Sequence, residues 1–386
     1  MKNIAILGST GSIGISALKV IRDNPDKYNV VALAAGRNIE LLNKQINDFR
    51  PILVAVMDDT LANDLSAMVQ GDGSPEILSG VEGLVCAATL DEADTVISAM
   101  SGGAGLLPTY EAIKAGKNIA LANKETMVMA GSLIMKEAEK RGVSVLPIDS
   151  EHSAILQSLR GHFREDIRRV ILTASGGPFR SVSLAEMDGV TPAQALNHPN
   201  WDMGPKISVD SATMMNKGFE VIEAKWLFDL EMDQIFILIH PQSIVHSMVE
   251  YRDGSIIAQL GIPDMRTPIS YALSYPRHYE TRLEPLNLDQ IKDLSFKRPD
   301  FKKFKCLELA FRAAEIGDSM PIVLNGANEV AVESFLRGGI KFLDISNIIE
   351  KTMEYHQPVP VDNIEEVMAV DRWARQAAAD VRDAGF

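Results

Sequence analysis

The chain has 386 residues, and its 38 Lys and Arg residues against 52 Asp and Glu residues give a formal net charge of −14 at pH 7. A hydrophobic content of 46% excludes a disordered chain and supplies enough apolar material for more than one core. The acidic balance argues against a nucleic-acid partner, which requires a basic surface, and weakly against a substrate made of phosphates.

Residues 1–149 alternate short β-branched apolar runs with segments of helical periodicity. This alternation predicts a mainly parallel sheet with helices on both faces, as in a Rossmann-like domain. The expected strands are Asn3–Leu7, Val30–Ala34, Leu53–Val56, Thr95–Ser98, Asn118–Leu121 and Ser144–Pro147. Between them lie segments of helical periodicity such as Ser12–Arg22, Leu106–Ala115 and Glu125–Lys140.

A glycine-rich loop, GSTGSIG at 8–14, follows the first expected strand and opens the first expected helix. Its glycines allow a tight turn and a close backbone approach, and a helix N-terminus offers free N–H groups to a pyrophosphate. The candidate donors are Thr10, Ser12 and Ile13. The motif is a relaxed form of the dinucleotide fingerprint, so a glycine turn that only closes the strand onto the helix is the alternative.

The end of the second expected strand indicates which nucleotide binds. NAD-binding proteins carry an acidic residue there for the ribose 2′-hydroxyl. In this chain the strand leads into Gly36, Arg37 and Asn38, and the first carboxylate is Glu40. An arginine matches a 2′-phosphate, so the sequence predicts NADPH in preference to NADH. The alternative is a solvated loop arginine.

Two carboxylates follow the last expected strand of this region, in the string IDSEH at 148–152. Residues two apart in an extended segment point to the same side, so Asp149 and Glu151 are expected to converge. Two hard oxygen ligands suit Mg²⁺ or Mn²⁺. A third ligand is needed, and Glu220 is a candidate that spacing alone does not select. The alternative is a helix that starts here, with an N-cap and a first-turn acid.

The composition changes after residue 149 to stretches rich in glycine and proline. We expect a second α/β domain, the catalytic domain, at 150–274. Thr191 followed by Pro192 predicts the start of a short helix, and Asp253-Gly254 predicts a hairpin turn. The other expected elements are a helix at Asn216–Phe228 and strands at Ile235–His240, Ser243–Tyr251 and Ser255–Leu260.

The last quarter of the chain reads as helical. Residues 275–300 are rich in proline and charge and are interpreted as a linker, and residues 301–386 as an all-α domain. Asp362 with Glu365 resembles a capping box. The expected helices are Leu307–Ile316, Pro321–Leu336, Ser346–Tyr355 and Ile364–Asp383.

Several strings, in order over essentially the whole length, resemble the 1-deoxy-D-xylulose 5-phosphate reductoisomerase family. They are GSTGSIG (8–14), AGRN (35–38), LANKE (121–125), PIDSEH (147–152), SGGPF (175–179), HPNW (198–201), KISVDSATMMNKG (206–218), IHPQSIVHSMV (239–249), LGIPDMRTPI (260–269) and LNGANE (324–329). Long strings such as KISVDSATMMNKG make a chance match implausible.

The resemblance implies an NADPH- and metal-dependent homodimer that converts 1-deoxy-D-xylulose 5-phosphate to 2-C-methyl-D-erythritol 4-phosphate for non-mevalonate isoprenoid biosynthesis. Co²⁺ is a third metal option beside Mg²⁺ and Mn²⁺. The implied metal ligands are Asp149, Glu151 and Glu220, which with Lys124 form the implied catalytic set. The implied cofactor contacts are Thr10, Gly11, Ser12, Ile13, Gly36, Arg37, Asn38, Asn123, Lys124 and Glu125.

The resemblance also places the substrate. The implied phosphate contacts are Ser175, Ser211, Asn216 and Lys217, and the implied sugar contacts are Ser150, Lys124 and Ser243, beside Glu151 and Glu220. A lid around 175–205 carries His198, Trp201 and Met203. With such local cations and a bound metal, the net charge of −14 no longer argues against a phosphate substrate.

Several of these residues also have a purely structural interpretation. Lys124 reads equally as a lysine that opens a helix, and Ser211, Asn216 and Lys217 as ordinary capping residues. Trp201 is either a core anchor or part of a lid. His152 is interpreted as a residue that orients the metal ligands, and His246 is as readily structural as catalytic. Trp226 and Trp373 are interpreted as packing residues.

Two other functional classes compete with this interpretation. An NADP-dependent semialdehyde dehydrogenase requires an activated cysteine, and neither Cys86 nor Cys306 lies in a recognisable activating setting. A non-enzymatic NADPH sensor requires no carboxylate cluster. Two separated cysteines favour a reducing compartment, and no uncharged apolar stretch approaches ~18 residues, so we expect a cytoplasmic protein with no membrane partner.

Overall fold

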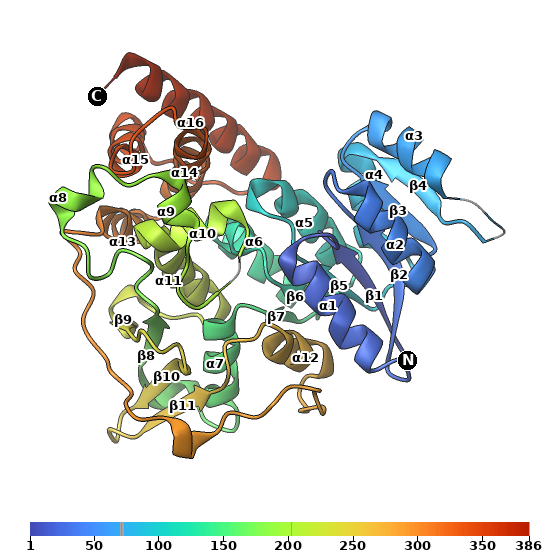
Figure 1. The fold of residues 1–386 in the computed structure, drawn as a ribbon, viewed down its shortest axis with the longest axis horizontal. Coiled ribbons are helices and arrows are strands. Elements are labelled where there is room, and N and C mark those ends of the chain that lie inside the picture. Colours follow the sequence, from blue (N-terminus) through green and yellow to red (C-terminus); the bar gives the residue numbers. More distant parts are fainter. Residues whose placement is uncertain (70, 72, 202, 386) are drawn as a thin grey trace. The chain divides into compact units, whose positions relative to one another are not determined.

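The computed structural model describes residues 1–69, 71, 73–201 and 203–385. The chain forms two compact units, each assembled from separate segments (Figure 1). Unit 1 comprises Met1–Thr126, Ile134–Ser153 and Asp264–Glu284, and unit 2 comprises Met127–Leu133, Ala154–Pro263 and Pro285–Phe386. The expected domains at 1–149, 150–274, 275–300 and 301–386 are contiguous, unlike these units, and they stay predictions.

Unit 1 contains a seven-stranded parallel sheet with the strand order β4-β3-β2-β1-β5-β6-β7. Strands such as LVAV at 53–56 are buried along their whole length, as expected where helices cover both faces. The parallel sheet predicted from the alternating pattern is therefore confirmed. The strands are β1 Lys2–Leu7, β2 Tyr28–Ala34, β3 Leu53–Val56, β4 Glu76–Ser79, β5 Thr95–Ser98, β6 Asn118–Leu121 and β7 Val145–Pro147.

The helices of unit 1 bury apolar faces against this sheet. Ile4 and Leu33 of the strands pack with Leu18 and Leu42 of the helices in one core. The helices are α1 Ser12–Asp23, α2 Ile39–Phe49, α3 Asp59–Met68, α4 Gly80–Thr89, α5 Leu106–Lys114 and α12 Arg266–Ser274, with the 3₁₀ turn η1 Gly102–Gly105. The sequence analysis named no element at α2, α3, β4, α4 or α12.

Two helices run from one unit into the other. Helix α6, Lys124–Arg141, departs from helical geometry at Ala130, where φ is −142° and ψ is 25°. Its middle segment, Met127–Leu133, belongs to unit 2, and its two ends belong to unit 1. Helix α7, Ser150–Leu159, starts in unit 1 and continues in unit 2.

Unit 2 contains a four-stranded mixed sheet with the order β11-β10-β8-β9. Its strands are β8 Ile167–Ala174, β9 Ile235–Ile239, β10 Val245–Tyr251 and β11 Ile256–Leu260. The predicted hairpin at Asp253-Gly254 is confirmed, since the Gly254 N–H donates to the Tyr251 carbonyl at 3.0 Å. Strand β8 was missed because Arg168 and Arg169 interrupt its apolar pattern. Both arginines pair with Glu250 on β10, at 2.8 and 2.6 Å.

Most of the rest of unit 2 is helical, and the described residues of the predicted all-α region, 301–385, are mainly helical as predicted. The long helices are α10 Pro205–Thr213, α11 Met215–Leu227, α13 Lys305–Ile316, α14 Met320–Leu336, α15 Asp344–Tyr355 and α16 Ile364–Ala384. The shorter turns are α8 Leu184–Met187, α9 Pro192–Leu196, η2 Arg164–Asp166, η3 Met232–Gln234 and η4 Leu288–Gln290. The capping box predicted at Asp362 and Glu365 is wrong by one residue, because the N-cap of α16 is Asn363, which accepts from the Glu366 N–H at 2.9 Å.

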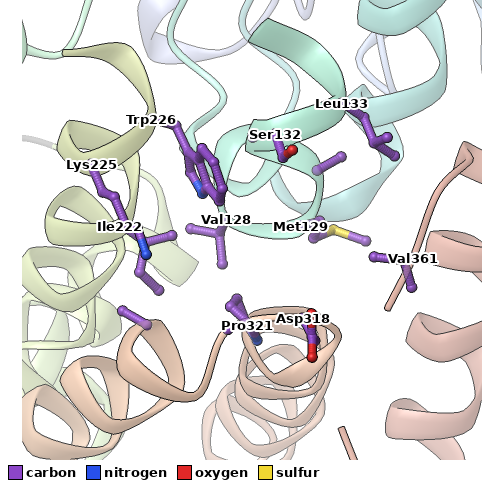
Figure 2. A pocket seen from close by; sticks show the side chains of 14 residues that line it. Val128, Met129, Ser132, Leu133, Ile222, Lys225, Trp226, Asp318, Pro321 and Val361 are labelled. Carbon is purple, nitrogen blue, oxygen red and sulfur yellow. The ribbon is translucent and has the colours of Figure 1, made fainter. Parts of the chain in front are cut away.

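A pocket of about 60 Å³ in unit 2 lies against the distorted turn of α6 (Figure 2). Figure 2 shows Val128 and Met129 of this turn, with Trp226 of α11 and Pro321 of α14 around it. Gly131 packs so closely on the Trp226 indole that a Cβ there would overlap the ring. Trp226 thus packs against its surroundings as predicted, and no predicted site residue lines this pocket.

No helix within the described residues combines the length and the apolar character that crossing a membrane requires.

Candidate active site

The glycine-rich loop lies where the strand order of the unit 1 sheet reverses. β1 pairs with β2 on one side and with β5 on the other, and parallel α/β sheets bind ligands at such a switch point. Gly8 has a φ of 90°, and a Cβ at this position would lie 2.5 Å from the Ala99 carbonyl oxygen. The close passage of two backbone segments therefore requires glycine here.

The loop ends in a helix N-terminus with unused donors. Gly11 is the N-cap of α1 and offers no side-chain cap. The N–H groups of Ser12 and Ile13 in the first turn have no acceptor inside the helix, and Thr10 lies next to them in the loop. Such an N-terminus suits an anion, so the geometry fits the pyrophosphate predicted from the sequence.

Gly36, Arg37 and Asn38 follow β2 at the same edge of the sheet. Asn38 caps α2, with its side-chain oxygen accepting from the Leu41 N–H at 3.1 Å. The Arg37 side chain is exposed, and no described residue forms a hydrogen bond or ion pair with its guanidinium. A free cation beside a glycine loop is compatible with a 2′-phosphate partner.

Asn123, Lys124 and Glu125 are all buried at the start of α6. Asn123 is the N-cap: its side-chain oxygen accepts from the Thr126 N–H at 3.0 Å, and its amide donates to the Gly102 carbonyl at 2.9 Å. The ammonium of Lys124 lies 2.5 Å from a carboxylate oxygen of Asp149. Lys124 is therefore the first residue of a helix, as its structural interpretation predicts. Its ammonium also contacts Asp149, a predicted metal ligand.

Asp149 and Glu151 lie close together within unit 1. Their carboxylate oxygens are within 4.8 Å of each other, and the Ser150 hydroxyl donates to Glu151 at 2.5 Å. The premise of an extended segment is wrong, because α7 begins at Ser150 and the Ser153 N–H donates to the Asp149 carbonyl. The two acids converge because one precedes the helix and the other lies in its first turn.

Glu220 and two predicted phosphate ligands form one cluster at the start of α11, in which Glu220 and Lys217 are buried. Glu220 is 1% exposed and accepts from the Asn216 amide at 2.6 Å. Its other carboxylate oxygen pairs with the Lys217 ammonium. The predicted metal ligand and predicted phosphate ligands of unit 2 are therefore direct neighbours.

Ser175 and Ser211 are brought together by a glycine. Gly177 has a φ of 66°, and a Cβ there would lie 2.6 Å from the Ser211 carbonyl oxygen. The Gly177 N–H also donates to the Ser175 hydroxyl at 3.2 Å. Ser211 lies near the end of α10, and Met214, with a φ of 64°, turns the chain into α11. The predicted phosphate residues of unit 2 thus lie on neighbouring loops and helix ends.

His198 connects the predicted lid to this region. Its Nε2 lies 3.0 Å from the Ser175 hydroxyl, and its Nδ1 accepts from the Trp201 N–H at 3.0 Å. An Nδ1 that accepts from the backbone assigns the proton of the neutral ring to Nε2. Burial, with a smaller contribution from the charge of Arg180, lowers the pKa of His198. The neutral ring is therefore the form that fits these bonds.

Asn200 joins the predicted lid to the segment before β10, and the sequence analysis did not name it. Its amide donates to the Ser243 hydroxyl and to the Pro241 carbonyl, both at 2.8 Å. Trp201 and Met203 are half-buried, and residue 202 of the expected lid lies outside the described residues. Asn200 lies within the string HPNW and Ser243 within IHPQSIVHSMV, but a single sequence does not reveal that the two strings meet.

Two further histidines and one of the cysteines are buried, whereas Cys86 is exposed. His152 is fully buried with its Nδ1 3.9 Å from Asp149, and His246 lies buried on β10. Burial, and then the charge of Asp210, raise the pKa of the Cys306 thiol to about 12. A thiol of that pKa is a poor nucleophile at neutral pH, so Cys306 does not support the semialdehyde dehydrogenase alternative.

The fold and these residues define a class of α/β protein. One unit has a dinucleotide loop at the switch point of a parallel sheet, and each unit contains carboxylates and polar residues of the kinds found in metal- and phosphate-binding enzymes.

The chain belongs to the 1-deoxy-D-xylulose 5-phosphate reductoisomerase family. The family model of that description matches residues 4–131. The model described as 1-deoxy-D-xylulose 5-phosphate reductoisomerase C-terminal domain matches 145–228, and that described as DXP reductoisomerase C-terminal domain matches 260–377.

Full-length relatives bear the same description. A 1-deoxy-D-xylulose 5-phosphate reductoisomerase of Geotalea uraniireducens is 57% identical over 99% of this chain and 98% of its own. A solved reductoisomerase of Zymomonas mobilis in complex with NADPH has 46% identity and a TM-score of 0.92, covering 100% of both chains. A solved DOX-P reductoisomerase in complex with NADPH, fosmidomycin and magnesium has 44% identity and a TM-score of 0.93, covering 98% of both chains.

Proposed function

We propose that the chain converts 1-deoxy-D-xylulose 5-phosphate to 2-C-methyl-D-erythritol 4-phosphate with NADPH, in non-mevalonate isoprenoid precursor biosynthesis. The observation that carries this proposal is the full-length similarity to reductoisomerases, 57% identical over 99% of the chain. The earlier inference against a phosphate substrate from net charge does not hold, because the relevant donors are local.

NADPH is the proposed cofactor, and solved relatives contain it. The loop fits the group, because Gly8 leaves no room for a side chain beside Ala99 and the N-terminus of α1 has free donors. Arg37 would hold the 2′-phosphate. The other proposed contacts are Thr10, Gly11, Ser12, Ile13, Gly36, Asn38, Asn123, Lys124 and Glu125.

A divalent ion is the second proposed cofactor, and a solved relative contains magnesium. We propose Mg²⁺, with Mn²⁺ and Co²⁺ as alternatives, held by Asp149, Glu151 and Glu220. The donor set fits the group, because two carboxylates within 4.8 Å of each other supply hard oxygens. When bound, the ion polarises the oxygens of the hydroxyketone and NADPH supplies the hydride.

The chain's own residues bind and orient the substrate in this proposal. Four residues hold the phosphate: the hydroxyls of Ser175 after β8 and Ser211 on α10, and the amide of Asn216 and the cation of Lys217 at the start of α11. Lys124 holds a substrate oxygen in this proposal and places positive charge beside it. Its ammonium lies 2.5 Å from Asp149, a proposed metal ligand. Ser150 and Ser243 supply hydroxyl contacts to the sugar.

The lid excludes water. His198, Trp201 and Met203 lie in the loop that Asn200 ties to Ser243 at 2.8 Å. A closed lid strengthens polar contacts inside the site, because water no longer competes for them. His152 is proposed to orient Asp149, 3.9 Å away, from its buried position.

The proposed assembly is a cytoplasmic homodimer. Strand β11 is an edge strand of the unit 2 sheet, with Ile256 53% exposed and Leu260 36% exposed. An edge with apolar side chains favours pairing with a second copy. Sedimentation of the purified protein at micromolar concentration tests the dimer.

Product identification tests the proposed function. The purified protein is incubated with NADPH, Mg²⁺ and 1-deoxy-D-xylulose 5-phosphate, and the product is followed by ³¹P NMR. Conversion to 2-C-methyl-D-erythritol 4-phosphate supports the proposal. Binding of NADPH with no conversion favours the sensor alternative. Loss of NADPH oxidation after alkylation of both cysteines would restore the semialdehyde dehydrogenase alternative.

A further inference from the structure

Asp210 is a buried acid directly before a proposed phosphate ligand in the sequence. It lies on α10 immediately before Ser211 and is 2% exposed. A carboxylate in this position is a problem for a site that binds a phosphate dianion, because two negative charges repel strongly where water is excluded. Such a site therefore requires a cation or hydrogen-bond donors that compensate the charge of the Asp210 carboxylate and fix its orientation.

Two described side chains, one earlier and one later in the sequence, bind the Asp210 carboxylate. The ammonium of Lys206, one turn earlier on α10, lies 2.9 Å from Oδ2. The side-chain amide of Asn328 donates to Oδ1 at 2.8 Å. A carboxylate with a cation on one oxygen and an amide donor on the other has a fixed orientation.

Asn328 reaches Asp210 from a distant part of the chain. It lies on α14, 118 residues further along the sequence, and it is 0% exposed. A buried hydrogen bond to a charged group is among the stronger polar contacts. The bond between Asn328 and Asp210 therefore holds α10 against α14. The proposed phosphate ligand Ser211 therefore depends on a helix that contributes none of the predicted ligands.

We propose that Asn328 is a positioning residue for the substrate phosphate: its amide holds Asp210 toward Lys206 and away from Ser211. This inference rests on the proposed function, since it assumes that Ser211 binds phosphate. It assigns a role to the string LNGANE at 324–329, which the sequence analysis noted but left without one.

The test compares Asn328→Ala with Asn325→Ala. Asn325 lies on the same helix, is also 0% exposed, and donates to Glu329 at 3.1 Å rather than to Asp210. Both variants lose a buried amide, so both are expected to lower the melting temperature. Only Asn328→Ala is expected to raise KM for 1-deoxy-D-xylulose 5-phosphate, by about tenfold, with KM for NADPH unchanged.

An exchange of the two groups tests the hydrogen bond itself. Asn328→Asp alone places two carboxylates together and is expected to weaken substrate binding more than Asn328→Ala does. The double variant Asp210→Asn with Asn328→Asp restores an amide–carboxylate pair and is expected to recover part of the loss. No recovery would show that the pair does not act through this bond.

Titration of inorganic phosphate by calorimetry separates this inference from the proposed function. If the wild type does not turn over the substrate, the proposed function is overturned, whereas weaker phosphate binding in Asn328→Ala than in Asn325→Ala still supports the role of Asn328. Equal KM and phosphate affinity in the two alanine variants would overturn the positioning role and leave Asn328 purely structural.

Discussion

Gly177 packs against the backbone of Ser211, so that a Cβ at position 177 would lie 2.6 Å from the Ser211 carbonyl oxygen. The contact joins the loop after β8 to the end of α10, two segments far apart in the sequence. Each segment carries a proposed phosphate ligand, Ser175 on one and Ser211 on the other. The spacing of the two serines therefore depends on the missing side chain of Gly177.

Gly177→Ala is expected to separate these ligands. The left-handed φ of 66° adds about 1–2 kcal/mol of strain for alanine, and the Cβ pushes the Ser211 backbone away. Misplacement of a positioned group by ~1 Å costs about 100-fold, so we expect kcat/KM to fall by about that factor with NADPH affinity retained. Gly189→Ala is the control, because nothing lies within 4 Å of a Cβ there. Equal kinetics in the two variants would contradict the role of the contact.

Arg37→Asp is expected to reverse the nucleotide preference. The Arg37 side chain is exposed after β2, so the change removes a phosphate partner and introduces an acceptor for a ribose hydroxyl without disturbing the core. We expect the Kd for NADPH to rise about 10- to 100-fold while that for NADH falls. Fluorescence titration measures both, with the exposed Lys44→Asp of α2 as a control for net charge. An unchanged preference for NADPH would remove Arg37 from the 2′-phosphate site.

Lys124→Met is expected to reduce turnover. The ammonium lies 2.5 Å from Asp149, and methionine keeps the length of the side chain but removes its charge. We expect kcat to fall about 100-fold, the usual cost of removing a positioned charge from an active site. Lys140→Met on the same helix removes an exposed ion pair with Glu137 and is expected to leave kcat unchanged. Wild-type kcat in Lys124→Met would leave Lys124 with its helix-opening role alone.

His198 gives the lid a pH dependence of predictable sign. Burial lowers its pKa below the ordinary value of 6.5, so the unfolded chain takes up a proton more readily than the folded one. The contribution of His198 to stability is therefore complete above pH 6.5 and is lost as the pH falls below it. The wild-type melting temperature is expected to fall more steeply than that of His198→Gln between pH 7.5 and pH 5.5. Parallel curves would argue against a neutral, buried His198.

Local patterns made much of the fold predictable. The strand at Leu53–Val56 and the strand at Thr95–Ser98 have the same bounds in the structure as in the prediction, because short runs rich in β-branched residues favour strands. Strand β8 was hidden because charged residues in a strand are readable only when their partner, here Glu250, is known. Helix α3 buries only Leu65, so its periodicity is weak.

The sequence motifs predicted many of the candidate site residues, but they did not predict the contacts between residues that are distant in the sequence. Asp149 and Glu151 were found by their position after a strand, although the reason given, extended geometry, is wrong since α7 starts between them. Glu220 could not be chosen by spacing, because its neighbours Asn216 and Lys217 matter only once α11 is seen. Asn200 and Asn328 act through distant partners, which a single sequence does not reveal.

The central claim is that turnover requires NADPH, the sugar phosphate and a divalent ion held by the acidic residues. The most direct test is the rate of NADPH oxidation with 1-deoxy-D-xylulose 5-phosphate, in the wild type and in Glu220→Gln, before EDTA, after EDTA and after excess Mg²⁺. We predict a wild-type rate that EDTA abolishes and Mg²⁺ restores, and no measurable rate in Glu220→Gln despite retained NADPH binding. Substrate-dependent oxidation that survives EDTA, or full activity in Glu220→Gln, would contradict the account.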